Sequence, residues 1–209
     1  LGAELCLSIL GNIEAEIRAL VNAQKYVENT DDEYLQALTY HVLANKYFLQ
    51  MSYDNALTLY KKSAEIFTKL DKKVNALYAY EGCKNSYASI GNFQEAIKIG
   101  EIAIGIAEEL GLMERVIPIM IDNYQYNNCK NDKVLSKIKQ YLFNEKERLG
   151  NEQYRYWGII YKNENKIDSA LYQYKNYIQN IAKHTHTTLG IILNILGIVK
   201  RLSVIIFDW

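Results

Sequence analysis

Proline is nearly missing from the sequence, with Pro118 alone in 209 residues. Because proline interrupts helices and is common in turns, its scarcity favours long uninterrupted helices and disfavours a β-sandwich, which needs more turn residues. Tyrosine, in contrast, occurs 18 times and can pack its ring between helices. The apolar content of 49% is enough for a substantial core, so we expect a folded, helical chain.

The sequence also lacks an excess of charge of either sign. Its 24 lysines and arginines balance its 24 aspartates and glutamates. No net field therefore attracts nucleic acid, an anionic membrane or an acidic substrate. We expect no nucleic-acid partner for this region.

Patterns typical of catalytic and cofactor sites are missing as well. There is no Gly-rich phosphate loop, HExxH, GxSxG or paired-carboxylate motif. Cys6, Cys83 and Cys129 are far apart and form no CxxC, which favours reduced structural thiols. His184 and His186 could supply two metal ligands on an extended segment, but with no third ligand in view a loop is the favoured interpretation. We therefore predict a protein that is not an enzyme and binds no cofactor.

A pattern of about 40 residues recurs along the chain. When Ala96 in "SIGNFQEAIKIGEIA" is aligned with Ala56 in "SYDNALTLYKKSA", an aromatic residue three positions earlier and a tyrosine nine positions earlier also align. "YWGIIYKNENKIDSALYQYKNY" fits the same frame without a gap, and "IDNYQYNNCKNDKVLSKIKQYL" is a degenerate copy. One period before Gly91-Asn92, Gly11-Asn12 in "LGNIEAEIRAL" takes the same place. Such a fixed period indicates a repeat architecture.

These copies resemble the tetratricopeptide repeat family, whose signature spaces large, small and aromatic residues over two helices. The best matches are Leu43-Ala44-Tyr47-Tyr53-Ala56-Tyr60 and Trp157-Gly158-Tyr161-Ala170-Tyr174. The copy at Cys83-Lys84-Tyr87-Gly91-Phe93-Ala96 departs from the signature at Lys84, where a small residue is expected. The resemblance implies an all-α, right-handed superhelical solenoid of antiparallel helix pairs.

The chain would then form about five such units between residues 1 and 184. They lie near 1–30 (with its first helix cut short), 34–71, 74–111, 114–148 and 151–183. Between two helices, Gly91 can take a positive φ at the helix end, and Asn92 can then cap the following helix. We expect turns of this kind to join the helices.

The family binds its ligands in the concave groove, which is lined by the first helix of each unit. The residues expected there are Leu38, His41, Asn45, Phe48 and Leu49 in the second unit; Tyr78, Glu81, Asn85 and Ser89 in the third; Ile117, Met120, Tyr124, Asn127 and Asn128 in the fourth; and Glu152, Arg155, Ile159 and Lys162 in the fifth. The resemblance thus predicts a protein- or peptide-binding groove.

Asn45 and Asn85 share one position of the repeat. A side-chain amide both donates and accepts hydrogen bonds, so a ladder of amides can hold an extended peptide backbone, and related solenoids use asparagine in this way. The alternative is that asparagine is simply abundant in this chain. His41 could likewise contact a ligand or be solvated or partly packed. The clamp for chaperone tails needs lysine in place of His41 and basic residues near Tyr78, so that partner is disfavoured.

The last segment, 185–209, is apolar on all sides from Leu189 to Val199 and is then interrupted by Lys200-Arg201. The apolar run is shorter than the ~20 residues that a membrane crossing needs. We favour a C-terminal apolar helix that packs on the fifth unit or is shared with a second copy in a homodimer. The alternative is the start of a membrane segment, the only route by which this region would meet a membrane.

The main hypothesis is a non-enzymatic binding module, the sensory or scaffolding part of a bacterial regulatory protein. Many bacterial regulators that this chain resembles carry a tetratricopeptide region before a membrane segment and an effector domain after it. The alternative is a structural module whose C-terminal helix drives homodimerisation. A cytoplasmic location is favoured, and a periplasmic one remains open if a signal segment precedes Leu1.

Overall fold

The computed structural model describes residues 2–184, with side chains for residues 12–181. The predicted C-terminal apolar helix, 185–209, and the predicted loop at His186 lie outside the described residues. The chain divides into two units, one up to Asn131 and the other from Asp132 onward.

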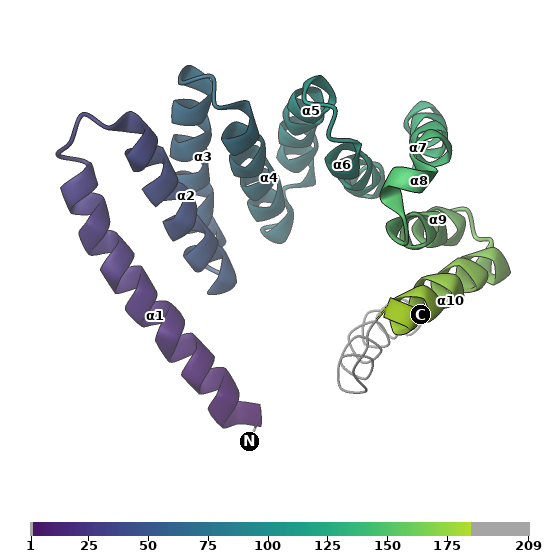
Figure 1. The fold of residues 1–209 in the computed structure, drawn as a ribbon, viewed down its shortest axis with the longest axis horizontal. Helices are drawn as coiled ribbons and strands as arrows, with labels where there is room; N and C mark the ends of the chain where they lie inside the picture. The colour runs from purple at the N-terminus through teal and green to yellow at the C-terminus, as the bar shows by residue number, and fades with distance from the viewer. Residues whose placement is uncertain (1, 185–209) are drawn as a thin grey trace. The chain divides into compact units, whose positions relative to one another are not determined.

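Helices account for nearly all of the described chain, and no strand is found between residues 2 and 184. The first unit contains α1 (Gly2–Val27), α2 (Glu33–Leu49), α3 (Tyr53–Lys69), α4 (Lys73–Ser89), α5 (Phe93–Glu109) and α6 (Met113–Tyr126). The second contains α7 (Asp132–Asn144), α8 (Lys146–Leu149), α9 (Glu152–Asn163) and α10 (Ile167–His184). Within the first unit each helix packs on the next, and successive helices run antiparallel (Figure 1). The prediction of an all-α array of helix pairs is confirmed.

The helices of the first unit are joined by nearly identical turns. Met51, Asp71, Gly91 and Gly111 stand 20 residues apart and all have positive φ, between 52° and 79°. After each of them, a backbone N–H reaches back to a carbonyl in the last turn of the preceding helix, as from Asn92 N to Tyr87 O at 2.9 Å. This closure satisfies carbonyls that the helix end would otherwise leave without a donor.

The turn predicted at Gly91-Asn92 is confirmed. Gly91 has a φ of +79°, and the Asn92 side chain accepts a hydrogen bond from Glu95 N at 3.3 Å, capping α5. Gly11-Asn12, which align with Gly91-Asn92 in the sequence, both lie within the continuous helix α1. Glycine in a helix costs about 1 kcal/mol relative to alanine. It does not by itself end a helix.

Small residues allow the helices to approach closely. Ala44, Ala56 and Ala96 are fully buried, and Tyr60 of α3 lies against Gly82 of α4. A Cβ added to Gly82 would lie 2.4 Å from Cε1 of Tyr60. In the second unit Tyr174 of α10 packs in a similar way on Gly158 of α9.

Lys84 departs from the family signature and is nevertheless buried, with an exposed fraction of only 2%. Its ammonium group forms an ion pair with Asp122 of α6 and lies 5.8 Å from the centre of the Tyr126 ring. Gly100 stands where Tyr60 stands in the preceding repeat, and the side chain of Asn123 fills the space next to it. The third copy therefore has a glycine on its second helix, and a side chain of the following first helix occupies the space.

Candidate partner-binding face

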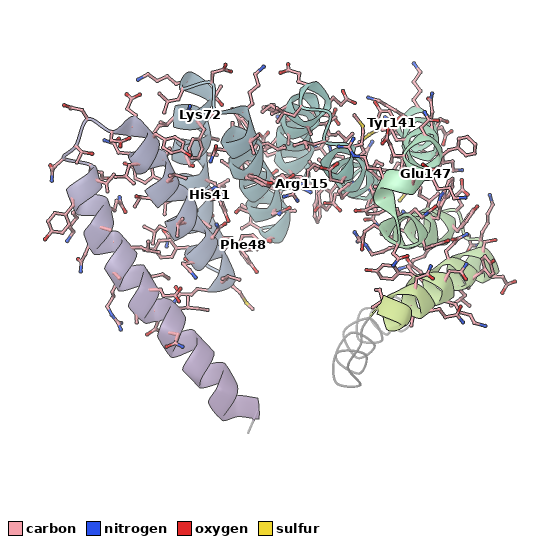
Figure 2. All side chains as sticks on the ribbon, in the orientation of Figure 1. His41, Phe48, Lys72, Arg115, Tyr141 and Glu147 are labelled. Carbon is pink, nitrogen blue, oxygen red and sulfur yellow. The ribbon has the colours of Figure 1, made fainter. Side chains whose placement is uncertain are left out.

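Two first helices of the first unit, α2 and α4, contact each other. They carry seven of the residues that the sequence predicts in the groove: Leu38, His41, Asn45 and Phe48 on α2, and Tyr78, Glu81 and Asn85 on α4. We call these seven residues the first-helix face. In Figure 2, His41 and Phe48 mark its α2 part.

Asn45 is exposed, but its side chain is held in place. Tyr60 donates a hydrogen bond through its hydroxyl to Oδ1 of Asn45 at 2.5 Å. Burial raises the pKa of Tyr60 to about 12, so the hydroxyl keeps its proton. Because the oxygen of the Asn45 amide is engaged by Tyr60, the Nδ2 end is the one that can donate to a ligand.

Asn85 occupies the same repeat position, 40 residues later, and is also exposed. The residue that corresponds to Tyr60 is Gly100, which has no side chain that could hold the amide. The two amide side chains therefore differ in how firmly they are held before a ligand binds. Asn45 is oriented in advance of binding, whereas Asn85 must lose rotamer freedom when a ligand binds.

His41 and Phe48 are half-buried on α2, as is Leu38. The ring of His41 contacts Tyr60 edge-on at a centroid distance of 5.5 Å, and burial lowers the pKa of His41. Its Nδ1 is buried without a hydrogen-bond partner among the described residues. Phe48 contacts Tyr53 of α3 edge-on at 5.2 Å. His41 is thus mainly a packed, neutral ring, one of the two outcomes that the sequence left open.

Tyr78 and Glu81 form a cluster with Arg115, the third residue of α6. The guanidinium of Arg115 lies 4.8 Å from the centre of the Tyr78 ring, and its Nη1 lies 3.6 Å from Oε2 of Glu81. Burial raises the pKa of Glu81, while Arg115 opposes this rise. Figure 2 shows Arg115 between α4 and α6. This cluster offers an exposed aromatic ring and a cation that is already partly neutralised.

Sequence reasoning missed Arg115, which precedes the repeat positions that usually face the groove. The sequence did contain an indication of this cluster. An arginine near the start of one first helix can reach a tyrosine and a glutamate on the first helix of the preceding repeat. That reach depends on the spacing between α4 and α6, which the sequence does not show.

The residues predicted on α6 divide into two groups. Ile117, Met120 and Tyr124 are buried, with exposed fractions of 0%, 5% and 4%. Asn127 and Asn128 are exposed, and Asn128 has a positive φ of 52° at the end of the helix. The expectation that Tyr124 is accessible is therefore not met, and Tyr124 is not included in the first-helix face.

In the second unit, α9 carries the remaining predicted residues. Arg155 donates from Nε to Oε2 of Glu152 at 2.6 Å and lies 4.5 Å from the ring of Tyr156. Lys162 is exposed and Ile159 is half-buried. Arg155 is thus engaged within its own helix, which leaves Lys162 as the accessible cation of the pair.

Among residues 12–181, no group of three or more His, Cys, Asp or Glu side chains is placed to hold a metal ion. In the same range, no helix is both long and apolar enough to cross a membrane. Buried Cys83 has a pKa raised to about 12, so it remains a thiol.

Comparisons with known proteins agree with this architecture. A family model described as "Tetratricopeptide repeat" matches residues 35–109. The comparison with curated protein sequences gave no match. The matched segment contains all of α3, α4 and α5 and nearly all of α2, the most regular part of the first unit.

Two solved structures illustrate the likeness in fold. A putative kinesin light chain from Podosopora anserina, with nearly identical TPR-like repeats, has a TM-score of 0.67 and 15% identity; the match covers 88% of this chain and 95% of that one. BtubC (BKLC) from P. vanneervenii has a TM-score of 0.63 and 18% identity, over 86% of this chain and 76% of that one. At these identities the likeness shows the fold alone.

The repeat pattern, the left-handed turns at 20-residue intervals, the packed helix pairs and the matching family model lead to one assignment. Residues 35–109 match the tetratricopeptide repeat family, and the chain is similar in fold to solved structures built from TPR-like repeats.

Proposed function

We propose that the first-helix face of α2 and α4 binds a protein or peptide partner and that the chain acts without catalysis. Tetratricopeptide repeats generally mediate protein–protein interactions. The observation that carries the proposal is the pair of exposed amides, Asn45 and Asn85, at the same position of adjacent first helices. In this arrangement Asn45 can donate through Nδ2, and Asn85 can both donate and accept, when an extended peptide backbone of any sequence binds.

Tyr78 and Arg115 would add side-chain preference to this backbone recognition. The Tyr78 ring is 41% exposed and lies next to the guanidinium of Arg115. Aromatic and arginine side chains are the residues most often found at the energetic centre of interfaces. Since Glu81 partly neutralises Arg115, the cluster does not favour a strongly acidic ligand. We therefore expect an extended, largely uncharged segment with an apolar or aromatic side chain that contacts Tyr78.

The chain would serve as the sensory or scaffolding part of a bacterial regulatory protein. This part of the proposal rests on the resemblance of the sequence to regulators that carry such repeats. The apolar sequence of residues 189–199 favours, as a second candidate, a structural role in self-association.

The proposal can be tested with extended peptides selected from a random library on the intact chain. Replacing both residues, Asn45→Ala and Asn85→Ala, should weaken binding of the selected peptides about tenfold or more, since two side-chain amides that hydrogen-bond to the peptide backbone are lost. Asn55→Ala is the matched control, because Asn55 is an exposed asparagine on the second helix α3. Circular dichroism should show unchanged helicity in all variants.

Asn45→Ala also leaves the Tyr60 hydroxyl without its acceptor. The double variant Asn45→Ala with Tyr60→Phe removes both partners and separates this structural effect from binding. Unchanged peptide affinity after loss of both Asn45 and Asn85 would contradict the proposal.

A further inference from the structure

Helix α1 is less buried than the other second helices of the first unit, α3 and α5. With an offset of 40 residues, Glu16 corresponds to Ala56 of α3, and Ala23 corresponds to Ser63. Ala56 and Ser63 are fully buried, whereas Ala23 is exposed and the side chain of Glu16 is 50% exposed. The same comparison holds for α5, where Ala96 and Ala103 are fully buried.

The cause of this burial in α3 is the first helix of the same repeat. The hydroxyl of Ser63 donates to the carbonyl oxygen of Ala37 in α2 at 2.9 Å. In α1, by contrast, four apolar residues join the cluster around Leu43 of α2, namely Ile13, Ile17, Leu20 and Val21. Figure 1 shows α2 beside α1 at this end of the first unit.

A face of α1 is thus left uncovered by the described residues. It consists of Glu16, Ala19, Ala23 and Tyr26, spaced three and four residues apart, and we call it the open face of α1. The Tyr26 ring is 78% exposed. At Ala19 and Ala23 the small side chains would let another helix approach closely.

A segment of this chain outside the described residues has the sequence of a first helix. Leu193, Leu196 and Gly197 have the spacing of Tyr40, Leu43 and Ala44 in α2. Gly197 also lies 39 residues after Gly158 of α9, which continues the period of the repeats. The segment 189–201 therefore has the apolar pattern and the small residue that the open face of α1 would accept.

The charges of the two elements are complementary. Glu16 stands where α3, α5 and α10 have Ala56, Ala96 and Ala170. Lys200 stands where α2 and α9 have Tyr47 and Tyr161. In α2 and α3, Tyr47 packs on the cluster that contains Ala56, so these two repeat positions are close neighbours. Acidic Glu16 of α1 would therefore lie close to basic Lys200 if the segment 189–201 packed on α1 as a first helix does.

We propose that the segment 189–201 of a second copy of this chain binds the open face of α1 and supplies the first helix of its repeat. The contact buries Leu193 and Leu196 and pairs Lys200 with Glu16, which already accepts an ion pair from Lys46. The association is head-to-tail, because one copy contributes its C-terminal segment and the other contributes α1. It does not depend on the peptide-binding role proposed for α2 and α4.

Sedimentation velocity of the intact chain over a range of concentrations tests the proposal. The chain should self-associate, and Lys200→Glu should raise the dissociation constant about tenfold through repulsion from Glu16. Glu16→Lys should do the same, and the two substitutions together should restore most of the affinity. A chain that stays monomeric at all concentrations, or single variants that associate like the parent, would overturn the proposal.

Glu16→Lys also removes the partner of Lys46, so a variant without this side effect is needed. Ala23→Glu places a charge on the open face, where the isolated chain has room for it, and should abolish association with helicity unchanged. Lys25→Glu is the matched control, because residue 25 lies about 200° around the helix from residue 23. Equal loss of association in both variants would contradict the assigned face.

Disulfide trapping tests the head-to-tail direction. The Ser63 to Ala37 hydrogen bond indicates which positions meet, and the corresponding pair is Ala23 and Gly190. In a background with the three native cysteines replaced, chains carrying Ala23→Cys and chains carrying Gly190→Cys should cross-link to each other when mixed. Cross-linking of the Ala23→Cys chain with itself, and not with the other, would indicate a symmetric contact and overturn the proposal.

Discussion

The repeats at 34–71 and 74–111 have helices of the same length and nearly identical turns, but they fill their interiors in opposite ways. The first has a large residue, Tyr60, on its second helix, which packs against Gly82 of the next first helix. The next has Gly100 at the position of Tyr60, and Asn123 of the following first helix fills the space beside it. Because protein interiors are close-packed, a change of volume on one helix is compatible with the fold only when a neighbouring side chain compensates for it. The repeats thus preserve a filled interior and not particular residues.

The two arrangements also satisfy their polar groups differently. Tyr60 donates to Asn45 within its own repeat, whereas Lys84 pairs with Asp122 of the following first helix. Polar groups at the first arrangement are satisfied locally. Those at the second connect two repeats, so substitutions there should affect stability over a longer stretch of the chain.

Restoring the large second-helix residue in the third repeat should have the largest effect. Gly100→Tyr should lower the free energy of unfolding by about 3 kcal/mol, because even a Cβ at Gly100 would lie 2.4 Å from Oδ1 of Asn123. Urea denaturation measures the change. Adding Asn123→Ala should recover much of it, and a double variant that is no more stable than Gly100→Tyr alone would show that Asn123 is not the compensating side chain.

Removing the partner of the buried lysine should have the next largest effect. Asp122→Ala should cost about 2 kcal/mol, since the Lys84 side chain, only 3% exposed, would lose its counter-charge. The value is below that of a fully buried pair because Asp122 is 39% exposed. Lys84→Met in the Asp122→Ala background should restore stability in the same denaturation experiment. Failure to do so would mean that Lys84 is not the source of the loss.

The tyrosines on the second helices allow a finer comparison. Tyr60→Phe should cost about 1 kcal/mol, because its hydroxyl donates to Asn45. Tyr174→Phe should be neutral or slightly stabilising, because the buried hydroxyl of Tyr174 has no partner among the described residues. Ile159 occupies the repeat position of Asn45. Ile159→Asn should therefore give the Tyr174 hydroxyl a hydrogen-bond acceptor, as Asn45 does for Tyr60. Thermal denaturation of the three variants measures their Tm values, and a Tyr60→Phe variant as stable as the parent would contradict the comparison.

The smallest effect concerns pH at one repeat position, where α2 has His41 and α4 has Glu81. Burial lowers the pKa of His41, so the unfolded state binds more protons than the folded state below about pH 6.5, and His41 makes the protein less stable as pH falls. Burial raises the pKa of Glu81, and its contribution changes in the opposite direction. His41→Phe should therefore lose less stability than the parent between pH 7 and pH 5, by under about 1 kcal/mol. An identical pH profile for both proteins would contradict this.

The turns between helices could be predicted from the sequence only in part. The positions of Gly91, Asn92 and Ala96 correctly predicted a turn and the buried start of a second helix, because these features depend on neighbours within a few residues. Gly11-Asn12 has the same letters as Gly91-Asn92 but lies inside α1. The same two letters therefore do not by themselves decide whether a helix ends.

The candidate site was harder to predict than the fold. Asn45 and Asn85 are exposed as expected, whereas Tyr124 is buried and Arg115 was missed. Repeat position indicates which side of a helix a residue occupies. It does not indicate what a neighbouring helix covers, which depends on helix spacing and side-chain volume.

The spacing of small, aromatic and turn residues along the chain is enough to predict the helical class, the 40-residue period and the resemblance to tetratricopeptide repeats. Only the tertiary structure showed that Lys84 is accommodated next to Asp122, that Tyr60 orients Asn45 and that one face of α1 is uncovered. These features depend on contacts between residues that are far apart along the chain. The volume and charge at such contacts are set by how the helices pack.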